Sequence, residues 1–246
     1  MLHGCMARRL RDFLEASPWR ACLTHSQMER VHGETAMRDF AAGSTVCFRG
    51  SPAAHWLGVV DGMLKVETVA ADGRATTFAG MPAGAWFGEG AAVKGGPRPY
   101  AVVAIRPSSV AFTPRETFLW LIDDSRAFGR WVIDQLNARL AHYGALMEIF
   151  RLRDLTARVA YCVSELFNPQ LYPYTGRELA ISQEEIARLC GLARQSTHRE
   201  LHTLQQAGLL RIRYGVIEVL DLEGMRRFSA RAAHRRKLAA RSISFD

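Results

Sequence analysis

Apolar and polar positions alternate over short runs between residues 35 and 113. The candidate strands are STVCFRG, HWLGVV, MLKVETVA, RATTFAGM, YAVVAI and SSVAFT, with Gly or Pro residues between them. Such runs are typical of strands, and ADGR at residues 71–74 fits a hairpin turn. The absence of helical patterns between the runs favours a small antiparallel β-roll over a parallel sheet. We predict this roll over residues 35–114, after an N-terminal helical segment at residues 1–34.

The periodicity changes after Pro114. Residues 115–150 contain no Pro, and Gly only at positions 129 and 144. One stripe recurs at steps of three and four residues: Phe128, Trp131, Val132, Gln135, Leu136, Arg139, Leu140, Tyr143, Leu146, Met147 and Phe150. This spacing predicts a long helix that a small roll cannot cover completely. We expect residues 115–150 to form a dimerisation helix, with part of the stripe packed on a second copy of the chain; a helix folded back wholly on its own domain is the alternative.

The segment ISQEEIARLCGLARQSTHRELHTLQQAGLL at residues 181–210 has the pattern of two short helices. Ser182 and Glu185 form an S-x-x-E capping pattern that begins the first helix. Gly191 ends that helix, and Gly208 ends the second. Two short helices with a glycine between them predict a helix-turn-helix.

Two alternating runs, LLRIR and VIEVL, follow on either side of Tyr214-Gly215. They predict a β-hairpin, which would be the wing of a winged helix. We assign residues 151–246 to a winged-helix DNA-binding domain with a basic tail. The predicted fold class is α+β, with an antiparallel β-roll, a long helix and a winged helix-turn-helix.

Charge is distributed unevenly along the chain, whose formal net charge is +8. Residues 1–150 carry 16 Lys or Arg and 14 Asp or Glu, whereas residues 151–246 carry 16 and 10. A basic C-terminal third favours a polyanionic partner such as double-stranded DNA. Charge alone fits a basic, solvated surface equally well.

In the predicted second helix, five polar side chains avoid the apolar stripe and lie near its N-terminal half: Arg194, Gln195, Ser196, His198 and Arg199. This end of a recognition helix enters the major groove. Arg can pair with guanine through two hydrogen bonds, and Gln can pair with adenine in the same way. Together with the turn, the wing and the charge, this favours DNA binding over a merely solvated helix face.

Composition narrows the remaining function classes. The chain contains no apolar run long enough to cross a membrane and no secretory signal, so we expect a cytoplasmic protein without a membrane partner. The five cysteines are scattered, which favours plain structural thiols. His198 and His202 have a spacing that can bind zinc, but a third ligand is not evident, so we expect no metal site. No nucleophile and base have usable spacing, and we expect no enzyme activity.

Several motifs occur in the order and spacing of a known family. FAAGSTVCFRGS, VVDGMLKV and GAWFGE precede the helix-turn-helix pattern. The chain from about residue 40 to residue 220 resembles the cyclic-AMP receptor protein and Fnr family of bacterial regulators. The resemblance implies a sensory β-roll, a dimerisation helix and a homodimer that binds pseudo-palindromic operators and works with RNA polymerase.

The resemblance also implies roles for residues of the helix-turn-helix. Arg194, Gln195 and Arg199 take the base-reading positions, and Ser182 and Gln183 take positions that hold backbone phosphates. The family often has Glu at the Gln195 position, so the operator core is expected to differ. It often has a capping Ser immediately before Arg194, where this chain has Ala193.

In the cyclic-nucleotide-binding members, the loop that corresponds to GAWFGEGAAVKGGPRPYA holds the ligand. This chain keeps Gly88, Glu89 and Arg98, which are the candidate ligand residues together with Tyr143. Pro99 replaces the usual hydroxyl residue, and Tyr143-Gly144 replaces the adenine-contacting pair on the long helix. These departures favour no nucleotide, while cyclic AMP and another nucleotide or anion stay open as cofactors.

A Rossmann-type phosphate loop is a separate interpretation of the same glycines. The required G-x-G-x-x-G is incomplete, and we expect no helix after it, so we reject this interpretation. A cyclic-nucleotide-responsive module that controls a partner protein, rather than DNA, remains the alternative function to a transcription regulator.

Overall fold

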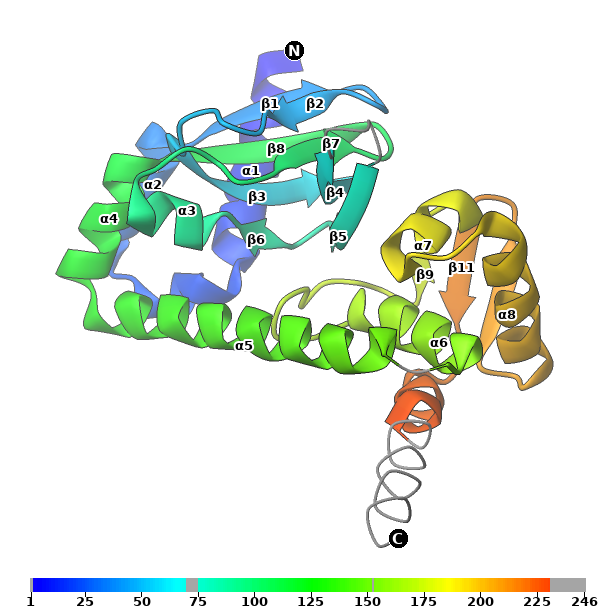
Figure 1. The fold of residues 1–246 in the computed structure, drawn as a ribbon. Coiled ribbons are helices and arrows are strands. Elements are labelled where there is room, and N and C mark those ends of the chain that lie inside the picture. Colours follow the sequence, from blue (N-terminus) through cyan, green and yellow to red (C-terminus); the bar gives the residue numbers. More distant parts are fainter. Residues whose placement is uncertain (1, 70–74, 152, 231–246) are drawn as a thin grey trace, which may run out of the picture. The chain divides into compact units, whose positions relative to one another are not determined.

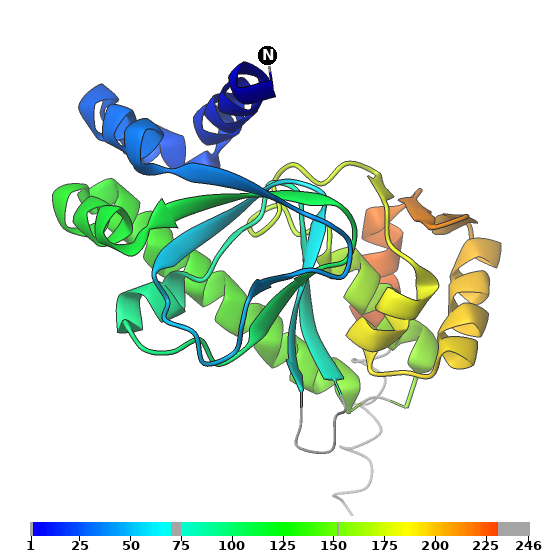
Figure 2. The same ribbon diagram turned by 90° about the horizontal axis from the view of Figure 1, so that it is seen from above.

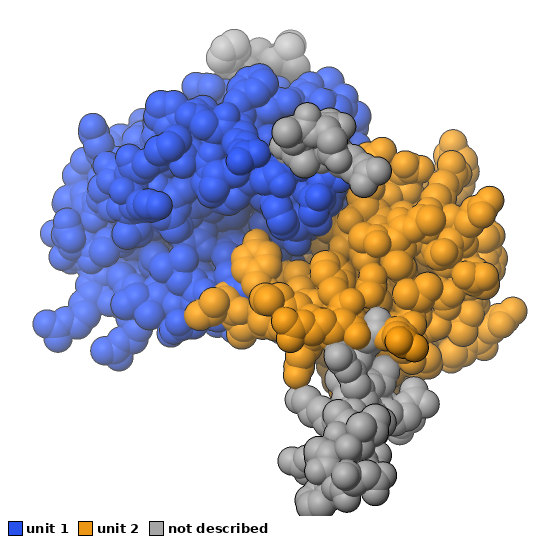
Figure 3. Space-filling view, in the orientation of Figure 1, with its two compact units in different colours: residues 1–139, 169–174 blue, residues 140–168, 175–246 orange. Residues whose placement is uncertain are grey.

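The computed structural model describes residues 2–69, 75–151 and 153–230. The predicted turn at residues 71–74 and the basic tail from residue 231 lie outside the described residues. The chain forms two compact units, coloured separately in Figure 3. The first contains residues 1–139 and 169–174, and the second contains residues 140–168 and 175–246.

The first unit begins with two helices and a short 3₁₀ turn. These are α1 (Leu2–Ala16), η1 (Pro18–Cys22) and α2 (His25–Glu34). A capping box begins α2: the Thr24 hydroxyl accepts from the Gln27 N–H, and the Gln27 side chain accepts from the Thr24 N–H. Figure 2 shows these helices in blue at one side of the strands.

Eight strands form the predicted antiparallel roll (Figure 1). One sheet has the order β1 (Ala36–Phe40), β8 (Ser108–Pro114), β3 (His55–Asp61), β6 (Trp86–Phe87). The other has the order β2 (Thr45–Cys47), β7 (Ala101–Ala104), β4 (Met63–Val69), β5 (Ala75–Pro82). All the strand pairs are antiparallel. The short helix α3 (Glu89–Lys94) follows β6 directly, so the expectation of no helix at this place was wrong.

Alternate side chains of these strands fill the interior of the roll. Leu57 and Val59 of β3 and Leu64 and Val66 of β4 are buried in one apolar cluster. Gly62 joins the two strands at φ +92°, and a Cβ there would lie 2.2 Å from the Ser108 hydroxyl. The turn therefore requires glycine both for its backbone conformation and for its lack of a side chain.

A second cluster in the first unit is aromatic. The cluster contains buried rings that meet edge to face or at tilted angles: Trp19, Trp56, Trp86, Phe118 and Phe128. They join η1 and the roll to α4 (Arg115–Asp124) and α5 (Arg126–Phe150). The predicted helical range at 115–150 thus contains two helices, with a break at Ser125, whose hydroxyl accepts from the Phe128 N–H.

The second unit has the predicted winged-helix elements. It contains α6 (Leu155–Glu165), β9 (Glu178–Leu179), α7 (Gln183–Cys190), α8 (Arg194–Gln206), β10 (Leu210–Arg213) and β11 (Val216–Val219). The three strands form one antiparallel sheet in the order β10-β11-β9. The α+β fold class is confirmed.

Candidate DNA-binding surface and ligand site

Local sequence signals position the two helices α7 and α8. The Ser182 hydroxyl accepts from the Glu185 N–H at 3.2 Å, so it caps α7 as predicted. Gly191 follows α7 at φ +60°, where it allows the sharp turn into α8. Thr197, Leu201 and other apolar-face residues of α8 are buried, which leaves the opposite face of that helix to solvent.

The structure brings most of the predicted DNA-binding residues onto one exposed region. Arg194, Gln195, His198 and Arg199 are exposed on α8, whereas Ser196 is half-buried. Gln183 of α7 joins them, because its side-chain oxygen lies 2.8 Å from Nδ1 of His198. This geometry places a guanidinium-rich helix beside the capped start of α7.

Glu200 is a positioning residue that the sequence reasoning missed. Its Oε1 accepts from Arg199 Nε at 3.2 Å, and its Oε2 accepts from the Thr156 hydroxyl of α6 at 2.6 Å. Glu200 therefore restrains Arg199 and connects α8 to α6. The sequence does not indicate this role, because Glu200 directly follows Arg199 on a helix face that is otherwise polar.

The first turn of α8 lacks a side-chain cap. Ala193 has the extended conformation of a capping residue, with φ −67° and ψ 147°, but makes no side-chain hydrogen bond. We expect Ala193→Ser to stabilise the second unit by about 1 kcal/mol, because a serine hydroxyl can accept from a free N–H of the first turn. Chemical denaturation followed by far-UV circular dichroism measures this change. Ala193→Val is the control, and equal stabilisation by both variants would contradict capping as the cause.

The candidate ligand residues of the roll meet around the start of α3. Gly88 precedes the helix at φ +89°, and a Cβ there would lie 3.0 Å from Nη1 of Arg98. Glu89 and Arg98 are 3% and 2% exposed, respectively. Arg98 Nη2 donates to the His55 carbonyl at 2.6 Å, while its Nη1 and Oε2 of Glu89 have no hydrogen-bond partner among the described residues.

Arg139 of α5 is the second residue that the sequence reasoning missed. Its Nε donates to Oε1 of Glu89 at 2.5 Å, and its Nη2 donates to the Trp86 carbonyl. The stripe on α5 predicted burial of position 139 but not its partner, which lies 50 residues earlier in the chain. Glu89 thus already has a cationic partner within its own unit.

Positive charge accumulates near Arg98. Burial, Arg38 and Arg98 together lower the pKa of His55, which favours its uncharged form at neutral pH. Burial raises the pKa of the Cys47 thiol, against the opposite effect of the same two arginines. An anion placed near Arg98 would meet a favourable field.

The donors fit a cyclic nucleotide only in part. The partnerless Arg98 Nη1 suits a phosphate, and the partnerless Glu89 Oε2 suits a hydroxyl donor. Pro99 offers neither a hydroxyl nor an N–H. Tyr143 and Gly144 lie on α5 beyond the boundary of the first unit, so their contact with a ligand remains a prediction.

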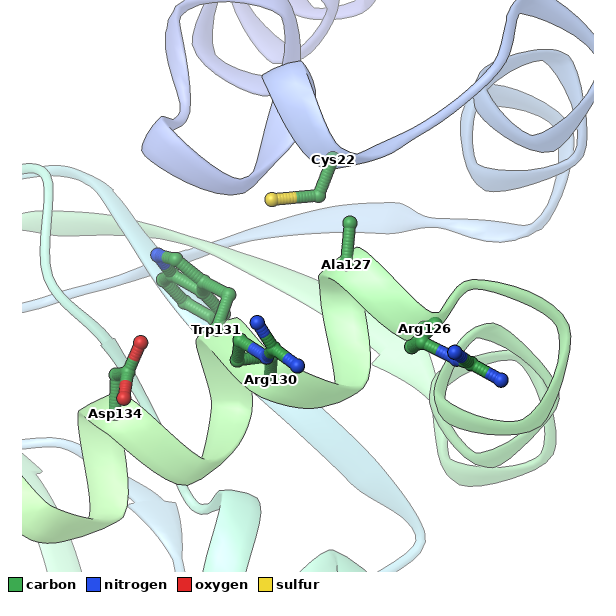
Figure 4. A pocket seen from close by; sticks show the side chains of 6 residues that line it. All are labelled: Cys22, Arg126, Ala127, Arg130, Trp131 and Asp134. Atoms are coloured by element: carbon green, nitrogen blue, oxygen red, sulfur yellow. The ribbon is translucent and has the colours of Figure 1, made fainter.

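A separate cavity of about 530 Å³ lies at the start of α5 (Figure 4). Its lining residues are Cys22, Arg126, Ala127, Arg130, Trp131 and Asp134. None of them was among the predicted site residues. Arg126 and Arg130 are exposed and lie four positions apart on α5, so this cavity is a hollow at the surface of the helix.

Models of known protein families match a part of each unit. The cyclic nucleotide-binding domain model matches residues 37–125, and the Crp-like helix-turn-helix domain model matches residues 157–228. Together these two matches span more than half of the chain. A sensory β-roll followed by this helix-turn-helix defines a DNA-binding transcription regulator. The chain belongs to the cyclic-AMP receptor protein and Fnr family of such regulators.

Individual relatives are distant but cover most of the chain. The "Cyclic AMP receptor protein" of Thermus thermophilus is 25% identical over 75% of this chain and 83% of its own length. The "CRP-like cAMP-activated global transcriptional regulator" of Mycobacterium tuberculosis is 25% identical over 77% of this chain and 86% of its own. FixK2 from Bradyrhizobium japonicum, a solved structure, shares the fold with a TM-score of 0.66 and 20% identity, covering 79% of this chain and 96% of its own.

None of the described helices is both long and apolar enough to span a membrane.

Proposed function

We propose that the protein acts in the cytoplasm as a homodimer that binds a two-fold symmetric site on duplex DNA and regulates transcription with RNA polymerase. In this proposal, α8 lies in the major groove. Arg194, Gln195 and Arg199 contact base edges, while Ser182 and Gln183 hold backbone phosphates. The observation that carries the proposal is the exposed, guanidinium-rich face of α8 within a capped helix-turn-helix.

The exposed residues of α5 support the homodimer. Ile133, Leu140 and Met147 are large, apolar and exposed, and they follow one another at intervals of seven residues. Phe150 is also exposed, three positions after Met147. A repeat of seven with an additional apolar position three residues on is the seam of a two-stranded coiled coil. Exposure of this seam in a single chain supports a second copy of α5 as its partner.

The role of the roll is regulatory in this proposal. Two partnerless buried atoms, on Glu89 and Arg98, support an anionic ligand that also donates a hydrogen bond. The Arg139–Glu89 pair and Pro99 argue against cyclic AMP bound in the manner usual for the family. A ligand screen therefore distinguishes three cases: a roll that binds cyclic AMP, a roll that binds another anion and a roll that binds no ligand.

Salt dependence tests DNA binding against control of a partner protein. We first select duplexes from a random pool and then measure affinity by fluorescence anisotropy between 50 and 200 mM salt. A dimer with six to ten phosphate contacts should lose about 10³- to 10⁵-fold in affinity over this range. Weak affinity at every salt concentration, without enrichment of any sequence, would instead support a module that controls a partner protein.

A further inference from the structure

The short segment between α6 and β9 belongs to the sensory unit and not to the DNA-binding unit. We call residues 169–174, with the sequence PQLYPY, the strap. The chain before it, up to Asn168, and the chain after it, from Thr175, both belong to the second unit. The peptide chain therefore leaves the DNA-binding unit, enters the sensory unit and returns within these six residues.

Two side chains of the strap are buried in the apolar core of the sensory unit. Leu171 is 2% exposed and Tyr172 is 4% exposed. Both lie in the apolar cluster that contains Val59, Leu64 and the other inward-facing residues of the two sheets. The Tyr172 hydroxyl lies 3.8 Å from the sulfur of Met81 on β5, across 91 positions of sequence. An aromatic and a branched aliphatic side chain of the strap are thus part of the packed apolar core of the roll.

Further contacts within the same unit hold the strap in place. The Gln135 side-chain amide of α5 donates to the Gln170 carbonyl at 3.2 Å. Gly84, at φ +90°, lies against Tyr174, and a Cβ at this position would come within 2.9 Å of the Tyr174 ring. The strap is therefore held at its start, at its centre and at its end.

We propose that Leu171 and Tyr172 are a built-in occupant of the roll, which competes with aromatic or branched apolar ligands for the same apolar packing site. A ligand that takes this place must expel the strap. Because the strap is continuous with α6 and with the segment that leads to β9 and α7, its release changes how the DNA-binding unit is tethered. Binding in the roll and binding to DNA are then coupled reciprocally, since each shifts the same equilibrium between seated and released strap.

Hydrogen exchange on the unmodified full-length protein gives the first test. The probe is 1-anilinonaphthalene-8-sulfonate, an aromatic apolar molecule. We expect saturable binding of this probe to raise amide exchange in Gln170, Leu171, Tyr172 and Tyr174. Amides within α6 should keep their protection. Saturable binding that leaves the strap amides protected would overturn the proposal, and so would failure of the probe to bind.

Side-chain truncation gives the second test. The double variant Leu171→Ala/Tyr172→Ala should bind the probe at least about fivefold more tightly than the wild type, because the competing side chains are gone. Its affinity for the selected duplex should change by at least about fivefold, the lower end of typical coupling between two sites. Leu121→Ala is the matched control, because Leu121 is a fully buried leucine of the same unit in the other apolar cluster.

The control should leave both affinities within about twofold of the wild-type values, well below the usual range of coupling. Equal effects of the double variant and Leu121→Ala would show general destabilisation and overturn the proposal, as would an unchanged duplex affinity in a folded double variant. If the double variant does not fold, the hydrogen-exchange experiment decides. That experiment requires no DNA, so failure of the proposed DNA binding would be seen separately, as weak duplex affinity of the wild type.

Discussion

Arg199→Ala should weaken binding to the selected duplex by about 1–3 kcal/mol, which is the usual value of a bidentate contact between arginine and guanine. The Arg199 side chain is 70% exposed on α8, so a base edge can reach its guanidinium group without rearrangement of the helix. Glu200 restrains the guanidinium through a hydrogen bond to Nε. Fluorescence anisotropy with the selected duplex measures the loss.

A matched control separates base recognition from loss of charge. Arg30→Ala removes one positive charge from a half-exposed arginine of the sensory unit, and it should leave duplex affinity nearly unchanged. Arg199→Lys keeps the charge but loses the planar fork of donors, so it should relax specificity at one base pair. If Arg199→Ala weakened specific and scrambled duplexes equally, Arg199 would contact phosphate and not a base.

Disruption of the exposed seam on α5 should have the larger effect. Leu140→Glu combined with Met147→Glu places two like charges of each copy in the predicted interface, where the wild type has apolar contacts. The Leu140 and Met147 side chains are 72% and 62% exposed, so the monomer itself loses little packing. We expect a dimer in the wild type and a monomer in the variant, as measured by sedimentation equilibrium.

Loss of the dimer should carry over to DNA. A monomer engages only one half-site, and loss of the second linked contact should lower duplex affinity by about 10²- to 10⁴-fold. Ala141→Glu is the control, because Ala141 is exposed on the same helix but one position away from the seam. If the double variant stayed dimeric, or if the wild type were a monomer, the seam would have another partner.

Features with local signals could be predicted from the sequence. The cap at Ser182, the glycine turn at Gly191 and the hairpin at Tyr214-Gly215 each depend on a few neighbouring residues, and all three occur in the structure. The β-roll was predicted for the same reason, because alternation and turn residues are read within single strands. The order of the strands in its two sheets did not follow from these signals.

Features that depend on long-range packing could not be predicted. Arg139 and Glu89 lie 50 positions apart, and either residue alone fits an ordinary polar position. The strap residues 169–174 contain two prolines, and nothing in PQLYPY indicates burial against a distant roll. The break at Ser125 was also missed, since serine is tolerated within helices as well as at their starts.

The aromatic cluster of the first unit has a spectroscopic consequence. All five tryptophans of the chain, at positions 19, 56, 86, 120 and 131, lie in the sensory unit. Emission excited selectively at the red edge of indole absorption therefore originates in the sensory unit, whereas the DNA-binding unit contributes only tyrosine. The tryptophan emission of the unmodified protein thus reports on the sensory unit, and it can distinguish melting of this unit from melting of the winged helix in one titration.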